Sequence, residues 1–94
     1  MVSVSLIDFI GKYKDGVSVI LSLEINEKFY EMMYWFNVYD KHTLVIDEEF
    51  YEDYPNIKDI MEYEPTKGLL EYLHSKILPP REEIFKKYGF NLEK

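Results

Sequence analysis

Residues Val17 to Asp47 decide the fold, and they read VSVILSLEINEKFYEMMYWFNVYDKHTLVID. From Val17 to Ile25 the apolar residues occupy alternate positions, with one exception, and this is the period of a strand with one face on a core. The run from Phe29 to Tyr39 is long and almost wholly apolar, and a third segment follows from Thr43 to Asp47. We therefore predict a three-stranded antiparallel meander. Its two tight turns are Asn26-Glu27-Lys28 and Asp40-Lys41-His42.

The central run has two unlike faces. Its even positions are apolar throughout, and we expect them to face the core; they are Tyr30, Met32, Tyr34, Phe36 and Val38. Its odd positions mix polar residues with Phe29, Met33, Trp35 and Tyr39. If every helix packs on one side of the sheet, this odd face stays open, and an open apolar face usually marks an association surface. The alternative is that short C-terminal helices wrap around the sheet and cover it.

The residues before this stretch carry the pattern of a helix. Ser5-Leu6-Ile7-Asp8 matches a capping box, in which a hydroxyl and an acid three residues later satisfy the first N–H groups of a helix. Leu6, Ile10 and Tyr13 then recur with helical spacing, and Gly16 can end the helix. We predict a short amphipathic helix before the strands.

Prolines divide the C-terminal part of the chain. Because the residue before a proline leaves helical geometry, these prolines predict two or three short helices. The last helix is expected from Arg81 to Tyr88. The earlier apolar stripes are Ile57, Ile60 and Met61, and then Leu69, Leu70, Leu73 and Ile77. With no internal repeat and no long linker, residues 1–94 are predicted to form one small acidic α+β domain.

Composition argues against several classes of protein. The 94 residues include no cysteine, which excludes a disulfide framework and a thiolate zinc site. No apolar run approaches the roughly 18–20 residues of a membrane span, and the first residues lack the features of a secretion signal. We therefore expect a cytoplasmic protein that does not enter a membrane. The net charge of -7 argues against direct binding of nucleic acid, whose phosphates repel an acidic surface.

The acidic residues are concentrated in one region. The stretch from Asp40 to Glu64 holds nine acids and two bases, so it carries the whole net charge. Its densest part interleaves five carboxylates with aromatic rings. One interpretation is a solvated segment whose acids stabilise a helix N-terminus, and the other is a binding patch for a basic partner surface. The patch comprises Asp47, Glu48, Glu49, Tyr51, Glu52, Asp53 and Tyr54.

The sequence contains no recognisable catalytic motif. The two histidines, His42 and His74, lack a second histidine at metal-binding spacing, and no serine lies in a nucleophile elbow. The four glycines stand far apart, so they form no phosphate-binding loop. We therefore predict no catalytic residue, no metal and no cofactor. An enzyme would need a pocket in which one of the histidines meets a carboxylate, and the sequence does not show whether such residues meet.

The leading functional hypothesis is a non-catalytic protein-interaction module whose acidic Asp47–Tyr54 segment engages a basic surface on a partner protein. One form of this hypothesis is an inhibitor whose carboxylates replace nucleic-acid phosphates in the groove of its partner. The alternative is a self-associating domain that forms a homodimer through Phe29, Met33, Trp35 and Tyr39. A third hypothesis is a small ligand-binding domain or enzyme without a recognisable motif.

Overall fold

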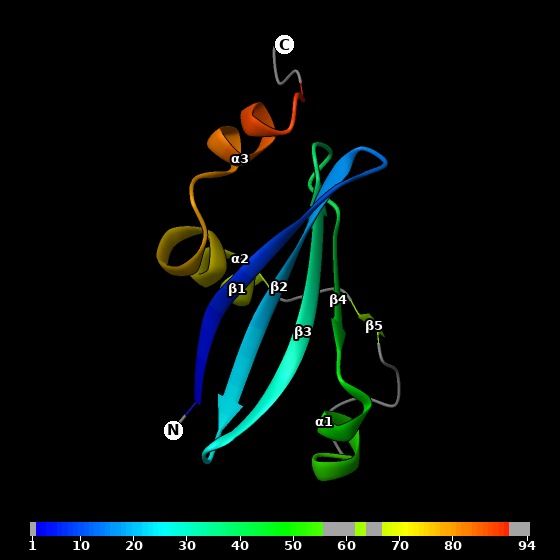
Figure 1. The fold of residues 1–94 in the computed structure, drawn as a ribbon, viewed down its shortest axis with the longest axis vertical. Coiled ribbons are helices and arrows are strands. Elements are labelled where there is room, and N and C mark those ends of the chain that lie inside the picture. Colours follow the sequence, from blue (N-terminus) through cyan, green and yellow to red (C-terminus); the bar gives the residue numbers. More distant parts are fainter. Residues whose placement is uncertain (1, 56–61, 64–66, 91–94) are drawn as a thin grey trace.

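Four antiparallel strands follow one another from the N-terminus and form most of the fold (Figure 1). The computed structural model describes residues 2–55, 62–63 and 67–90. A short fifth strand pairs with the fourth, and the five strands lie across the sheet in sequence order. They are β1 (Val2–Tyr13), β2 (Gly16–Ile25), β3 (Lys28–Asn37), β4 (His42–Ile46) and β5 (Glu62–Tyr63).

Strands β2, β3 and β4 confirm the three strands predicted from the alternation of apolar residues. The strand β3 ends at Asn37, two residues earlier than the predicted end at Tyr39, because Asn37 starts a turn. The side-chain Oδ1 of Asn37 accepts hydrogen bonds from the backbone N–H groups of Tyr39 and Lys41, each at 2.9 Å. These bonds fold the backbone away from the ladder.

The predicted N-terminal helix is wrong, because residues 2–13 form β1 beside β2. Val4, Leu6 and Phe9 pack against the core, at spacings of two and then three residues. Two β-bulges, one after Leu6 and one after Phe9, shift the register of β1 against β2. Each bulge inserts one extra residue, and this converts a period of two into a spacing that imitates a helix. The fold is α+β, with four leading strands in place of a helix and a three-stranded meander.

The core lies on one face of the sheet. Alternate residues of the three inner strands point into it and are buried: Val17, Val19, Leu21, Leu23, Tyr30, Met32, Tyr34, Phe36, Leu44 and Ile46. The even positions of β3 therefore face the core, as predicted, and Val38 packs against it beyond the end of the strand. Because neighbouring side chains on a strand point in opposite directions, the odd positions face away from the core.

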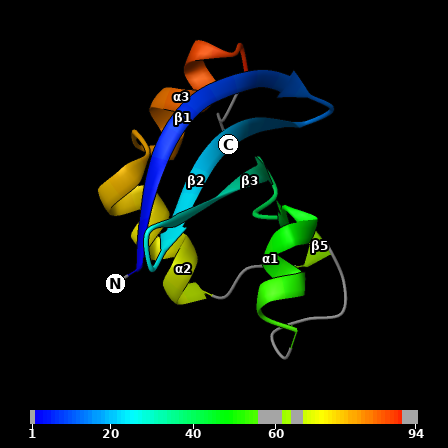
Figure 2. The same cartoon turned by 60° about the horizontal axis from the view of Figure 1, so that its bottom comes forward.

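Four short helical segments pack against this same face (Figure 2). They are α1 (Glu48–Asp53), α2 (Lys67–Tyr72), η1 (Leu73–Ile77) and α3 (Arg81–Lys87). Phe50, Leu73 and Phe85 are their most central side chains, and all three belong to the core cluster. Figure 2 shows α2 and α3 on the β1 side of the sheet and α1 on the side of β5. The described helices leave the opposite face of the sheet uncovered.

The C-terminal helices agree with the sequence wherever the structure describes them. The last helix is α3, and the stripe from Leu69 to Ile77 forms α2 and η1. The turns of η1 are wide, since Leu78 donates its N–H to the carbonyl of Leu73 at 2.7 Å, five residues back. The predicted stripe at Ile57 lies outside the described residues. Within those residues, no helix has both the length and the apolar character needed to cross a bilayer.

Gly16 begins β2 directly beneath the ring of Trp35. A Cβ atom at this position would lie 2.4 Å from the backbone oxygen of Phe36 and 2.6 Å from the indole. The indole Nε1–H also donates a hydrogen bond to the backbone carbonyl of Tyr13, at 3.2 Å. Trp35 therefore crosses the end of the β1–β2 hairpin, and only glycine leaves room for it.

We expect Gly16→Ala to lower the free energy of unfolding by about 1–3 kcal/mol, because backbone and ring must both shift to admit a methyl group. Urea unfolding followed by circular dichroism measures this change. Gly68→Ala is the matched control, since a Cβ at Gly68 meets nothing within 4 Å and α2 gains helix propensity. Equal stability of the Gly16→Ala and wild-type proteins would show that the indole does not hold this position.

Candidate functional site

The uncovered side of the sheet is the first candidate site, and we call it the open face. Ile20 on β2 stands opposite Met33 on β3, and Met33 stands opposite Val45 on β4, so an apolar row crosses three strands. Trp35 and Thr43 form the next cross-strand pair toward the end of β3. On these three strands the open face comprises Ser18, Ile20, Ser22, Glu24, Phe29, Glu31, Met33, Trp35, Thr43 and Val45.

A groove of about 630 Å³ lies on the open face. Its floor is formed by Met33, Trp35 and Val45, with Ser18 and Thr43 beside them. The last residues of β1 and its turn form the other wall; they are Ile10, Gly11, Lys12, Tyr13 and Lys14. Because two strands separate β1 from β4, this groove extends across the width of the sheet.

A smaller depression of about 330 Å³ continues the groove past Met33 and Val45, which line both. Its other lining residues are Ile46 and the acids Glu31, Asp47 and Glu48. The open face thus has an apolar middle and two charged ends. We call them the lysine end, with Lys14, and the acidic end, with Glu31, Asp47 and Glu48. The ammonium of Lys12 lies on the core side instead, 4.6 Å from the centre of the Phe90 ring.

The residues predicted to form an association face differ in their exposure. Phe29, Met33 and Tyr39 are exposed, and Trp35 is half-buried because its indole lies over Gly16. Met33 and Trp35 line the groove, whereas Phe29 and Tyr39 line neither depression. Met33 and Trp35 are therefore the members of the predicted set that line the groove.

Sequence reasoning missed the contribution of β1 to the open face. Ile10 and Tyr13 line the groove and are 51% and 58% exposed, whereas their spacing in the sequence predicts the apolar stripe of a helix. The alternation of valine and serine from Val2 to Ser5 favours a strand, and it was the signal available in the sequence. Gly11, with φ of 134°, lies at the second bulge and marks the bend.

The acidic Asp47–Tyr54 segment forms α1, so its acids do lie in the first turn of a helix. Three of its carboxylates are engaged inside the fold. Lys28 Nζ lies 2.7 Å from Asp53 Oδ2 and 3.3 Å from Glu49 Oε2. Asp47 Oδ2 accepts the backbone N–H of Glu31 at 3.0 Å.

The remaining members of this segment fall into two groups. Glu48 and Glu52 are exposed and form no ion pair or hydrogen bond through their side chains with any described residue. Tyr54 is half-buried and packs against Tyr30 and Phe50, and Tyr51 packs edge-on against Phe50. The segment is therefore not a uniform patch, since its aromatic rings anchor α1 to the sheet.

Asp53 is the main electrostatic anchor of α1. Hydrogen bonds from Lys28 and then from the Tyr30 hydroxyl, the latter at 2.5 Å, lower the pKa of the Asp53 carboxyl. The hydrogen bond to Asp53 raises the pKa of Lys28, and the hydrogen bond to Asp53 raises the pKa of Tyr30 to about 12. These shifts keep Asp53 and Lys28 charged and Tyr30 neutral at pH 7, so none of the three groups is ready to exchange a proton.

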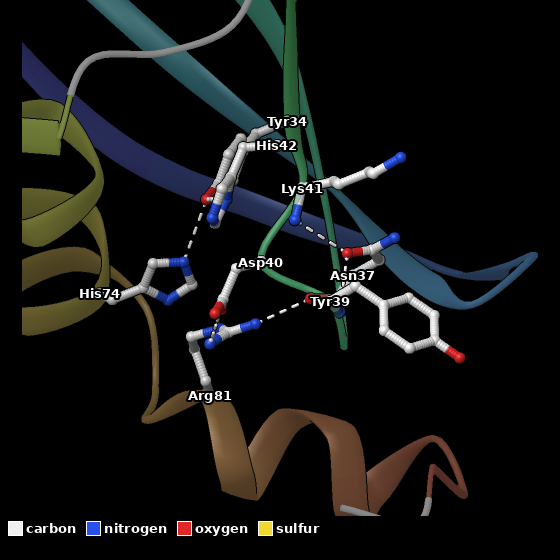
Figure 3. Close-up of polar contacts among 8 residues, drawn as sticks. All are labelled: Tyr34, Asn37, Tyr39, Asp40, Lys41, His42, His74 and Arg81. Carbon is white, nitrogen blue, oxygen red and sulfur yellow. Dashed lines mark hydrogen bonds and ion pairs between the residues drawn. The ribbon is translucent and has the colours of Figure 1, made fainter.

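The two histidines, which lie far apart in the sequence, meet at Tyr34 (Figure 3). The Tyr34 hydroxyl lies 2.6 Å from His42 Nδ1 on β4 and 3.1 Å from His74 Nε2 on η1. The ring of Tyr34 stacks parallel to that of His42, with centroids 5.8 Å apart. This cluster lies on the core side of the sheet, and neither histidine lines the groove or the smaller depression.

Tyr34 and His74 are both suited to their neutral forms at pH 7. Burial raises the pKa of the Tyr34 hydroxyl, while burial, Arg81 and His42 together lower the pKa of His74 to about 4. His74 Nδ1 is buried with no hydrogen-bond partner among the described residues. A proton on this nitrogen would be a buried N–H without a partner, so the favoured tautomer carries its proton on Nε2. In this tautomer His74 Nε2–H donates to the Tyr34 hydroxyl, and the hydroxyl donates to His42 Nδ1.

Arg81, the first residue of α3, closes the far side of this cluster. Its Nη1 donates to Asp40 Oδ1 and its Nη2 to the backbone carbonyl of Asn37, both at 2.7 Å (Figure 3). The Asp40 carboxylate is therefore already paired with the Arg81 guanidinium. Among the described residues, no three His, Cys, Asp or Glu side chains group closely enough to hold a metal ion. We interpret the cluster as a hydrogen-bonded part of the core.

His74 makes the stability of the protein depend on pH. Because its pKa falls from 6.5 in the unfolded chain to about 4 in the fold, the unfolded chain binds the extra proton between these values. Acidification from pH 7 to pH 5 should therefore lower the free energy of unfolding by roughly 1 kcal/mol through this partly solvated ring. Urea unfolding of wild type and His74→Gln at both pH values isolates the pH dependence due to His74, which the variant should lack. The same pH dependence in both proteins would assign it to other groups.

The two candidate regions thus differ in what they offer to another molecule. The cluster of Tyr34, His42 and His74 is partly buried and its three side chains are hydrogen-bonded to one another, whereas the open face presents an apolar middle between opposite charges. No protein family, curated protein or solved structure matches this chain, so the functional argument rests on the geometry of the open face.

Proposed function

We propose that the protein is a non-catalytic interaction module that binds another protein chain through the open face of its sheet. The observation that carries this proposal is the groove across the sheet, whose floor is formed by Met33, Trp35 and Val45 and whose wall contributes Ile10 and Tyr13. Ile10, Tyr13 and Met33 are each more than two-fifths exposed there. Exposed apolar surface of this kind, bounded by charged residues, is typical of protein-binding sites.

The acidic segment contributes to the same surface at one end. Glu48 is the first residue of α1 and Asp47 precedes it, and both line the acidic end of the open face. Glu52 adds a further exposed carboxylate one turn along α1. A nucleic-acid-like row of five free carboxylates has less support, because Asp47, Glu49 and Asp53 are bonded within the fold. We therefore place the apolar middle at the centre of binding and the acids at its rim.

We expect Met33→Lys to abolish capture of the bound protein, because a charged side chain at the centre of the groove must be desolvated without a partner. The measurement is affinity capture from extract of the source organism, with bound protein quantified by mass spectrometry. Tyr72→Lys is the matched control, since Tyr72 is similarly exposed but lies on α2. A protein retained equally by wild type and both variants would contradict the assignment of the open face.

A second pair of variants separates the acidic rim from the apolar middle. Glu48→Lys combined with Glu52→Lys should weaken capture more strongly at low salt than at high salt, because rim charges are screened by ions. Their side chains form no hydrogen bond or ion pair with a described residue, so stability should change little. Complete loss of capture at every salt concentration would instead place the acids at the centre of binding.

A further inference from the structure

We propose that the protein bound on the open face is a second copy of this chain. The two copies pack face to face about a two-fold axis that lies in the interface, passes near Met33 and is perpendicular to the line from the lysine end to the acidic end. This inference rests on the proposed function, because it names the partner of the same surface. It also fixes how the two copies are turned relative to one another.

The first argument is the order of charges along the open face. Lys14 lies in the β1–β2 turn at one end of the groove, and Glu48 lies at the start of α1 at the other end. Met33 and Val45 lie between the two ends and line both depressions. A partner with a uniformly basic surface would meet the lysine end with repulsion. A good partner must carry both signs of charge in the opposite order.

The second argument is symmetry. A second copy rotated by 180° about this axis places its acidic end over the lysine end of the first copy, and the reverse contact forms at the same time. Lys14 then faces Glu48 of the second copy twice in one interface. An axis along the line that joins the two ends would instead place like charges over one another, which is unfavourable. The charge order therefore selects one of the two face-to-face arrangements.

The third argument concerns the middle of the face. Near the two-fold axis each residue meets itself, so Met33 packs against Met33 of the second copy. An unbranched, adaptable side chain suits such self-contact. The exposed rings of Tyr13 lie to one side and add apolar area. Apolar contact at the centre supplies affinity, while the charges at the rim set orientation.

Sedimentation velocity across a range of protein concentrations tests the inference with the purified full chain. Wild type should form a dimer, and Lys14→Glu and Glu48→Lys should each raise the dissociation constant tenfold or more, because each creates two like-charge contacts. The double variant K14E/E48K should restore the dimer, since its reversed charges again face opposite charges. Lys76→Glu and Glu71→Lys, exposed residues of η1 and α2, are the matched charge-reversal controls.

The double variant separates the two possible axes. With the axis along the line that joins the two ends, the two glutamates at position 14 would face one another and the double variant would stay dissociated. Circular dichroism and thermal unfolding establish that each variant is folded. An equimolar mixture of the two single variants should also form a dimer, which gives a second readout that needs no doubly altered chain.

The outcomes distinguish this inference from the proposed function. A wild-type monomer at all concentrations overturns the second copy as partner, and Met33-dependent capture of a different protein would then still support the open face as a binding site. A dimer that survives Met33→Lys, or a folded double variant that stays monomeric while wild type dimerises, also overturns the inference. If neither a dimer nor Met33-dependent capture is observed, both proposals fail.

Discussion

Leu21 on β2 stands opposite Met32 on β3, Val19 stands opposite Tyr34, and all four side chains are almost completely buried. This packing of two inner strands on one face is the constraint on which the rest of the structure depends. Ten consecutive cross-strand pairs fix the register of β2 against β3, and a shift by one residue would turn the whole apolar set toward solvent. Once the register is fixed, one face must take the helices and the other receives Met33, Trp35 and their neighbours.

The helices are attached near the two ends of β3. At its beginning, Lys28 and Tyr30 bind Asp53 of α1, and just beyond its end the turn that starts at Asn37 binds Arg81 of α3. These contacts are polar and partly exposed, so each adds modestly to stability and mainly sets where the helix lies. Both helices are thereby held on the core side, and the groove on the opposite side stays uncovered.

The extent to which the sequence predicts this structure follows from the range of the interactions involved. The strands at 17–47 are predictable because alternation is local, and Met33 and Trp35 are found because they lie on the odd face of β3. The strand β1 is mistaken for a helix because two bulges change its spacing, so Ile10 and Tyr13 are missed. The meeting of His42 with His74 depends on how η1 packs on the sheet. Likewise, the pairing of Lys28 with Asp53 joins residues 25 positions apart, and no local sequence pattern predicts it.

Trp35 is the one tryptophan of the chain, and its indole forms part of the groove floor over Gly16. Tyrosines elsewhere in the chain absorb at the same wavelengths, but excitation near the red edge selects the indole alone. The emission of this ring depends on the polarity of its surroundings, so it changes when water is displaced from the groove. The protein therefore contains its own optical reporter at the surface where we place binding, and occupancy of that surface is visible without any label.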